Sequence, residues 1–141
     1  MPDTLPAPAP PITFETKEFW EGTTQGKLLL PKCNACQTII WYPRLFCPNC
    51  GSEDIGWQQA SGRGTVYSYT VNRRPNENVA YRGEGGAPLV YVLAYVELAE
   101  GPRIMTNIVE CDPDTVKVGM PVSVVFHDTG QGSALPRFKP A

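Results

Sequence analysis

The sequence has no excess of basic residues, and this bears on the partners it can bind. Its 12 Lys and Arg residues are outnumbered by 14 Asp and Glu residues, which gives a formal net charge of −2. Nucleic-acid-binding proteins usually carry a basic surplus, because neutralising phosphates supplies most of their affinity. We therefore predict no nucleic-acid partner for this chain.

Long hydrophobic runs are also missing. No stretch approaches the ~20 apolar residues that a membrane span requires. Residues 1–11 are rich in Pro and Ala and lack the basic and apolar regions of a secretory signal. We therefore expect a cytoplasmic protein without a membrane partner, in a compartment where cysteines stay reduced.

The residue types of most active sites are scarce. His127 is the only histidine, and Cys111 is the only cysteine outside two closely spaced pairs. A cysteine beside a histidine can act as a nucleophile, but neither an orienting third group nor an oxyanion motif accompanies these two residues. No glycine-rich phosphate-binding motif precedes a helix. We predict no catalytic residue and expect the chain not to be catalytic alone.

What the sequence does have is four cysteines with metal-ligand spacing. Cys33 and Cys36 form one C-x2-C pair, and after ten residues Cys47 and Cys50 form a second. Each pair can deliver two thiolates through one tight turn, and four thiolates complete a tetrahedral zinc site. A closed coordination sphere leaves no position for water or substrate, so we predict structural zinc. Iron in a rubredoxin-like site is the alternative metal.

The rest of the pattern indicates a mainly β fold. Fifteen prolines and 13 glycines favour short strands and turns over long helices. About five strands with one long loop suit an OB-type antiparallel barrel, with an open sandwich as the alternative. The clearest strands are expected at residues 65–71, 89–98, 103–109 and 122–127.

Two details of this pattern are specific enough to test. Alternation in the strand 65–71 places Tyr67, Tyr69 and Val71 on one side. Residues 128–141 are polar and rich in Gly and Pro, so we expect a C-terminal tail with one apolar patch at Leu135 and Phe138.

We divide the chain into four parts. Phe19 and Trp20 lie in the short helical part and need a surface to bury them, either the chain's own ribbon or a partner subunit. The four parts are a flexible Pro/Ala arm at 1–12, an N-terminal helix at 13–26, a zinc ribbon at 27–58, and a barrel with its tail at 59–141.

A polar loop at 73–87 separates two of the strands. It carries or adjoins Arg73, Arg74 and Arg82. A loop of this length in a small domain often has a binding role, and arginine forks suit phosphates such as those of coenzyme A. These arginines either contact the phosphates of coenzyme A or form an ordinary solvated surface.

Several short motifs accompany the two cysteine pairs. They are Phe-Trp-Glu-Gly at 19–22, Gly-Lys-Leu-Leu at 26–29, Tyr-Pro-Arg at 42–44, and the segments 61–70, 118–122 and 135–138. Taken together, they resemble one known family, the zinc-ribbon and OB-fold proteins found beside thiolases and other acyl-CoA enzymes. The resemblance extends from about residue 14 to residue 138.

The resemblance implies a short N-terminal helix, a rubredoxin-like zinc ribbon and a C-terminal OB barrel, with Cys33, Cys36, Cys47 and Cys50 as metal ligands. It also implies a non-catalytic accessory subunit in a hetero-oligomer with a thiolase-fold acyl-CoA enzyme, stabilising the complex and shaping its CoA site. Gln37 departs from the glycine that relatives often have after the first cysteine pair.

Two alternatives stay open at this point. Relatives also associate with MaoC-type acyl-CoA hydratases and with thiolase-like aldolases, and the sequence does not separate these partners. An OB module that binds single-stranded nucleic acid is the other alternative, since exposed tyrosines can stack on bases. The candidates for stacking are Tyr67, Tyr69, Tyr91 and Tyr95.

Overall fold

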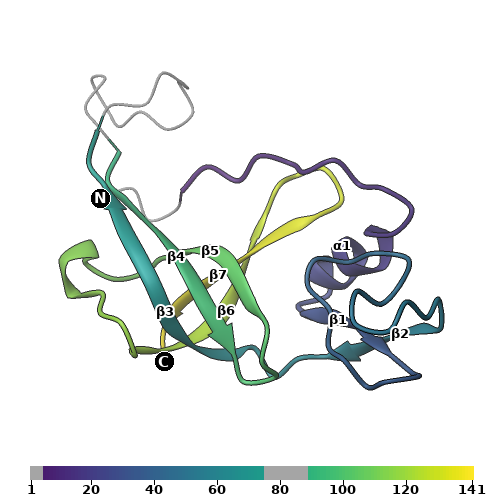
Figure 1. The fold of residues 1–141 in the computed structure, drawn as a ribbon. Coiled ribbons are helices and arrows are strands. Elements are labelled where there is room, and N and C mark those ends of the chain that lie inside the picture. Colours follow the sequence, from purple (N-terminus) through teal and green to yellow (C-terminus); the bar gives the residue numbers. More distant parts are fainter. Residues whose placement is uncertain (1–4, 75–88) are drawn as a thin grey trace.

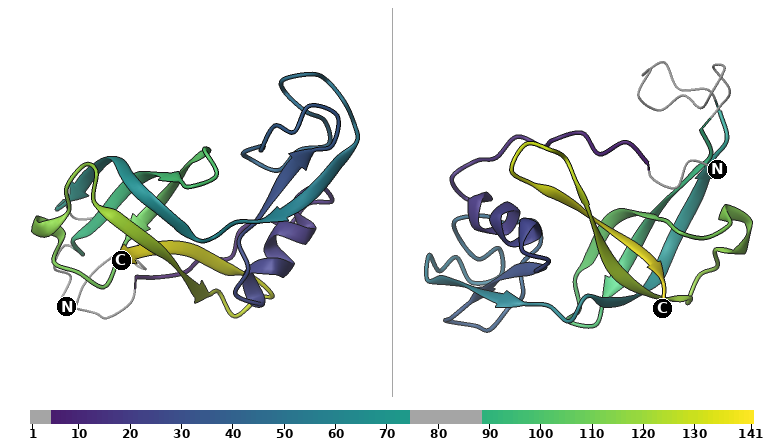
Figure 2. Two further views of the ribbon diagram at one scale, coloured as in Figure 1. Left: turned by 90° about the horizontal axis from the view of Figure 1, so that it is seen from below. Right: turned by 180° about the vertical axis from the view of Figure 1, so that it is seen from behind.

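A short helix, a two-stranded ribbon and a barrel follow one another along the chain (Figure 1). The computed structural model describes residues 5–74 and 89–141. Helix α1 and the ribbon form a smaller lobe beside the barrel, as the views from below and behind also show (Figure 2). The predicted fold class is confirmed. Within the described residues, no helix is long and apolar enough to cross a membrane.

Helix α1 (Lys17–Thr24) is shorter than the predicted segment 13–26. It begins after Thr16, the N-cap residue, whose carbonyl accepts a hydrogen bond from the Trp20 N–H at 3.1 Å. Its end is fixed by Gly26 at φ +71°, a left-handed conformation that glycine adopts without steric cost.

The aromatic residues of α1 are buried within this chain. Phe19 is 0% exposed and Trp20 is 7% exposed, and both belong to a hydrophobic core that continues into the barrel. The proposal that a partner buries them is therefore wrong for the Phe19 side chain. The physical reason is that α1 packs against the ribbon, which was one of the two expected surfaces, and also against the barrel, which was not expected.

The ribbon consists of β1 (Leu29–Cys33) and β2 (Ile55–Gln59), paired antiparallel. Leu30 is fully buried and joins the same core as α1. Residues 34–54 connect the two strands and carry the cysteine turns, so the strands form the base from which those turns project.

The barrel closes in the order β3-β4-β5-β7-β6. Alternate residues of β4, including Val92, Ala94 and Val96, are at most 2% exposed and form the inner face of the barrel. Between β5 and β6 the chain forms the 3-10 helix η3 (Pro113–Thr115). The strands are β3 (Arg63–Asn72), β4 (Tyr91–Leu98), β5 (Arg103–Ile108), β6 (Pro121–Asp128) and β7 (Ala134–Pro140).

Strand β7 corrects two predictions. The expected polar tail is a barrel strand, and its Phe138 is 0% exposed. The barrel is also mixed and not wholly antiparallel, because β7 pairs parallel with β5 at Ile108 and Phe138. Pro136 and Pro140 made a strand look improbable. Each lies two residues from Phe138 and therefore directs its backbone to the same side of β7. The Phe138 carbonyl faces β5, which pairs only sparsely with β7, so the N–H groups that the prolines lack are not needed there.

A bulge in β3 corrects the predicted alternation. The register with β4 shifts between Val66 and Ser68, so Tyr67 is the extra residue. Val66 stays in the core, while Tyr67 turns outward and is 47% exposed. Tyr67 and Tyr69 are therefore not on one side of the strand, because the pattern of alternation changes at the bulge.

The N-terminal arm follows a defined path from the barrel to α1 (Figure 1). The guanidinium of Arg137, on β7, donates to the carbonyl of Leu5 at 3.1 Å and also bonds the carbonyl of Pro6. Arg137 is 2% exposed, so these contacts lie beneath the arm. The flexibility expected for residues 1–12 stays a prediction, but residues 5 and 6 have partners on the barrel.

Candidate metal centre and the groove between the lobes

The four predicted metal ligands meet at the tip of the ribbon. The sulfurs of Cys33, Cys36, Cys47 and Cys50 all lie within 4.8 Å of one another. Cys33 and Cys47 are buried, Cys36 is half-buried and Cys50 is exposed. This is the one group of three or more His, Cys, Asp or Glu side chains with metal-binding proximity in the described part of the chain.

The spacing of the sulfurs fits a tetrahedral metal. The Sγ atoms of Cys33 and Cys50 are 3.6 Å apart, as are those of Cys36 and Cys47. Zn–S bonds of about 2.3 Å place the sulfurs of a tetrahedron about 3.8 Å apart. Disulfides require about 2.05 Å, so the arrangement suits a shared cation and not two covalent bonds.

The two cysteine turns are built alike. In the first, the Gln37 N–H donates to the carbonyl of Cys33 at 2.8 Å. In the second, the Gly51 N–H donates to the carbonyl of Cys47, also at 2.8 Å. This repeated local geometry explains how two short segments far apart in sequence present equivalent pairs of sulfurs.

The turns differ in the residue that closes them. Gln37 has φ +67° and Gly51 has φ +78°, so both occupy the left-handed region. Glycine does so freely, whereas a side chain costs on the order of 1 kcal/mol there. The Gln37 side chain offsets part of this cost by donating to the carbonyl of Asn34 at 3.0 Å.

The thiols have unequal affinities for protons. The Thr38 hydroxyl, its backbone N–H and the Asn49 side-chain amide lower the pKa of Cys36 to about 5. The Ser52 backbone favours the Cys50 thiolate, but hydrogen bonding with Cys33, burial and the other two thiols outweigh it and raise the pKa of Cys50 to about 12. Cys36 is thus prepared as a thiolate ligand, while Cys50 needs a cation to lose its proton.

Cys111 and His127 do not form the reactive pair that was considered. Burial raises the pKa of the Cys111 thiol, which keeps it protonated. The Nδ1 atom of His127 lies 2.9 Å from Nη1 of Arg137, so the imidazole accepts a hydrogen bond from the guanidinium.

The arginines proposed for coenzyme A lie in three different situations. Arg73 forms an ion pair with Asp114, beside the start of the loop. Arg74 is exposed, and its backbone N–H donates to the side chain of Asn72 at 3.0 Å. Arg82 lies outside the described residues. The pairing of Arg73 reduces its availability for a phosphate.

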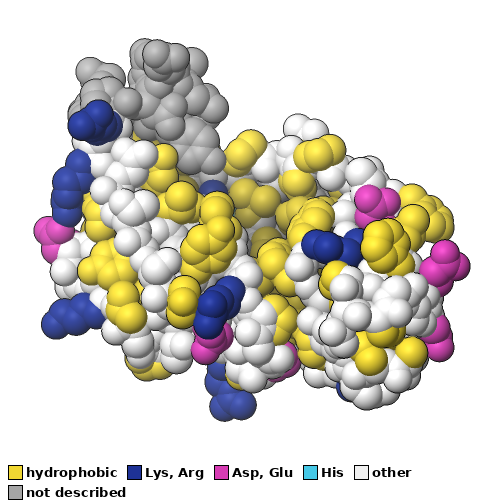
Figure 3. Space-filling view, in the orientation of Figure 1, with side chains coloured by type: hydrophobic (Ala, Val, Ile, Leu, Met, Phe, Trp, Pro, Cys, Tyr) yellow, Lys and Arg dark blue, Asp and Glu magenta, His cyan; other side chains and the backbone are white. Residues whose placement is uncertain are grey.

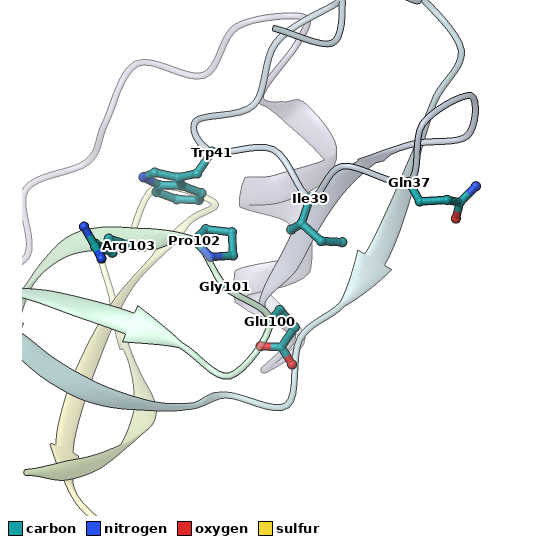
Figure 4. Close-up of a pocket in the computed structure, with 7 residues that line it drawn as sticks. All are labelled: Gln37, Ile39, Trp41, Glu100, Gly101, Pro102 and Arg103. Carbon is teal, nitrogen blue, oxygen red and sulfur yellow. The ribbon is translucent and has the colours of Figure 1, made fainter. Parts of the chain in front are cut away.

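A groove between the lobes is a feature that the sequence did not reveal. One cavity of about 540 Å³ lies between the ribbon, at Ile39 and Trp41, and the β4–β5 hairpin, at Pro102 and Arg103 (Figure 4). A second, of about 250 Å³, has Trp41 and Tyr42 on the ribbon side. Their linings combine residues more than sixty positions apart, so no local pattern could indicate them.

Comparison with known proteins matches both parts of the chain to one family. Residues 20–56 match the rubredoxin-like zinc ribbon domain of ChsH2, and residues 57–127 match the C-terminal OB-fold domain of ChsH2. The border between them, at 56 and 57, lies within β2.

Curated relatives share the sequence over most of this chain. A probable enoyl-CoA hydratase alpha subunit of Thermomonospora curvata is 37% identical over 95% of the chain, which spans only 40% of that relative. A DUF35 domain-containing scaffold protein of Methanothermobacter thermautotrophicus is 35% identical, covering 79% of this chain and 81% of the relative. The benzoylsuccinyl-CoA thiolase subunit BbsA of Geobacter metallireducens is 31% identical, covering 77% and 69%.

A solved structure has the same fold. The chain matches one described as the Ltp2-ChsH2(DUF35) aldolase with a TM-score of 0.81 and 36% identity. The match covers 94% of this chain and 98% of the solved one.

Proposed function

We propose a function for this chain on the basis of its family. The chain belongs to the ChsH2 family, whose members combine a rubredoxin-like zinc ribbon with an OB-fold domain. In our proposal it is a non-catalytic accessory subunit that stabilises an acyl-CoA enzyme of the thiolase type. The observation that carries the proposal is the match over nearly the whole chain to proteins named as scaffolds or as subunits of such enzymes.

The metal centre supports a structural role. The chemistry of four thiolates suits zinc, and we propose Cys33, Cys36, Cys47 and Cys50 as its ligands. Zinc held in this way would fix the two cysteine turns to each other and to the base of the ribbon. Four protein ligands leave no position for a substrate, so the chain contributes a shaped surface and not a reacting group.

A partner of another acyl-CoA chemistry is the second candidate. The relative from Thermomonospora curvata is named a hydratase subunit, and the solved structure is described as an aldolase. The three chemistries differ in substrate and product: thiolysis cleaves a 3-oxoacyl-CoA with a thiol, hydration adds water to a 2-enoyl-CoA, and retro-aldol cleavage splits a 3-hydroxyacyl-CoA. A contribution of Arg73 or Arg74 to the CoA site is the finer part of the proposal, and it predicts a raised KM for acyl-CoA when both are changed to Ala.

The test is purification of the tagged chain from its own cells. We expect one larger enzyme subunit to co-purify at a fixed stoichiometry with a zinc-bearing chain. Mass spectrometry identifies the subunit, and assays for thiolysis, hydration and aldol cleavage on the complex identify the chemistry. A zinc-bearing chain that elutes alone, with no acyl-CoA enzyme, would refute the proposal.

A further inference from the structure

The outer face of the barrel carries an apolar surface that the chain itself does not cover. Tyr67, Leu93, Tyr95 and Met105 are 37–55% exposed although they lie on three adjacent strands, β3, β4 and β5. Tyr95 and Met105 are direct cross-strand partners, and the β3 bulge turns Tyr67 outward beside them. Clustered exposure of this kind marks an interaction site more often than scattered apolar residues do.

This surface continues into the groove between the lobes. Met105 also lines the 250 Å³ cavity, whose opposite wall includes Trp41 and Tyr42 of the ribbon. Tyr42 is itself 39% exposed. Figure 3 shows hydrophobic side chains over the barrel lobe and within the hollow between the lobes on one side of the molecule.

The arginine among the barrel tyrosines is paired within the chain. Arg103 donates from Nε to the carboxylate of Glu97 at 2.8 Å, and its guanidinium lies 3.7 Å from the centre of the Tyr67 ring. A single-stranded nucleic acid needs cations along its phosphates as well as aromatic rings for its bases. The tyrosines are present, but the arginine among them is already neutralised, so the chemistry favours an apolar protein surface.

The shape argues against a second copy of this chain as the occupant. Two copies related by a two-fold axis bury the same surface on both sides, so that surface must complement itself. Here the outer barrel face continues at Met105 into a hollow between the lobes, and a hollow that faces a second copy of itself stays unfilled. A projecting apolar element of a different protein fits it better.

We propose that Tyr67, Leu93, Tyr95 and Met105, together with Trp41 and Tyr42 across the groove, form the docking surface for the larger acyl-CoA enzyme subunit. This rests on the proposed function and names the face through which it is carried out. The groove takes a projecting apolar segment of that subunit, and the tyrosines bury their rings around it while their hydroxyls stay at the rim. Tyrosine and methionine are enriched at such interfaces.

The first experiment locates the contact in the purified complex. A photo-crosslinking amino acid replaces Tyr95 or Met105, with Phe14 (85% exposed) and Val118 (67% exposed) as matched exposed positions elsewhere. We expect crosslinks to the enzyme subunit from Tyr95 and Met105 and none from the other two positions. Crosslinks only from Phe14 or Val118, or from Tyr95 to a second copy of this chain, would overturn the proposal.

The second experiment measures affinity. Met105→Glu and Tyr95→Glu place a charge in the surface without touching the core. We expect each to weaken binding of the enzyme subunit at least about 30-fold, the effect of an interface hot spot. Val118→Glu should change it by no more than about twofold. Zinc content and the thermal unfolding midpoint of the free variants check that they fold.

The outcomes separate this proposal from the proposed function. If no acyl-CoA enzyme co-purifies with the unmodified chain, the proposed function fails and the docking surface fails with it. If the enzyme co-purifies but Met105→Glu and Tyr95→Glu bind it as well as the unmodified chain, only the docking surface is wrong. Binding of a fluorescent oligo-dT at low salt that Tyr95→Glu abolishes would instead assign the face to single strands.

Discussion

The tip of the ribbon and the barrel are stabilised by different means. The core at the tip consists of Cys33, Ile40 and Cys47, and two of these three are proposed metal ligands. The core of the barrel is a continuous cluster of apolar side chains in which Val96 and Phe138 are fully buried. The comparison teaches that the tip has little apolar core of its own, so its stability should depend on the proposed metal, whereas the barrel is stabilised by buried apolar surface.

The division between the tip and the apolar core does not coincide with the division between the two lobes. Phe19, Leu28 and Leu30 belong to the smaller lobe but lie in the same core cluster as the barrel strands. Helix α1 and the base of the ribbon should therefore share the stability of the barrel. Residues from Cys33 to about Ile55 should form a separate, metal-dependent unit.

Metal removal should have the largest effect and tests this division directly. Structural zinc contributes about 10–16 kcal/mol of apparent binding free energy in small zinc domains. We expect a chelator, or Cys47→Ser, to abolish hydrogen-exchange protection in the cysteine turns while β3 to β7 keep theirs. Cys111→Ser, at the cysteine outside the cluster, should retain one metal per chain. Simultaneous loss of protection in both regions would show a single cooperative unit.

A core truncation in the barrel should destabilise the barrel and leave the metal-bound tip intact. Phe138→Ala removes a fully buried ring, and such changes cost about 3–5 kcal/mol. We expect the free energy of unfolding in urea to fall by about that amount while the folded variant keeps its metal. Val118→Ala, at an exposed position, should have little effect. Metal loss from folded Phe138→Ala would mean that the two regions are more tightly linked than their cores indicate.

Removing a hydrogen bond to Cys36 should have a smaller effect, on the affinity for the metal. Thr38→Val removes the hydroxyl that lowers the pKa of Cys36, so that pKa should rise and metal binding should require higher pH. Losing a supporting hydrogen bond of this kind costs about 10–100-fold in metal affinity. Competition with a chromophoric zinc chelator between pH 6 and 8 measures it, with Thr70→Val on the barrel as the control. Unchanged affinity across this range would contradict the role assigned to Thr38.

The two cysteine turns can be compared by exchanging their closing residues. Gln37→Gly should stabilise the metal-bound tip by up to about 1 kcal/mol, because glycine occupies φ +67° without the steric cost of a side chain. Gly51→Ala should destabilise it by a similar amount. Thermal unfolding of the zinc-bound proteins measures both. We expect the unfolding midpoint to rise for Gln37→Gly and to fall by a similar amount for Gly51→Ala. If both changes lower it, the hydrogen bond from Gln37 to Asn34 contributes more than the strain costs.

The smallest effect is a pH dependence at the base of the N-terminal arm. Burial, then the charge of Arg137, lower the pKa of His127 in the folded chain, against an opposing effect of Glu110. The unfolded chain therefore binds the proton more readily, so this contribution to stability is present above about pH 6.5 and is lost as pH falls below it. Urea unfolding at pH 7.5 and 5.5 should show a smaller loss for His127→Gln than for the unmodified chain. An identical loss would exclude His127 as the source.

Prediction from the sequence succeeded where the governing interactions are local. The C-x2-C spacing fixes two turns that each depend on only a few residues, and the four cysteines were identified as a group without knowledge of the fold. The strand β4 was likewise predicted from its sequence, because an alternating run of apolar residues is a local pattern.

Prediction failed where distant segments decide the outcome. The bulge at Tyr67 depends on pairing with β4, and β7 is a strand only because β6 pairs along its whole length. The contact between Arg137 and Leu5, which lie more than 130 residues apart in sequence, was likewise not predicted. These contacts join segments that are distant in sequence, so no periodic pattern in either segment indicates them.

The sequence by itself determined the grouping of the four cysteines and the mainly β class, because these depend on residue type and short spacing. Only the tertiary structure decided that Phe19 is buried within the chain and that Trp41 of the ribbon and Met105 of the barrel line one groove. The physical reason is that burial and surface shape arise from segments brought together by the packing of the two lobes.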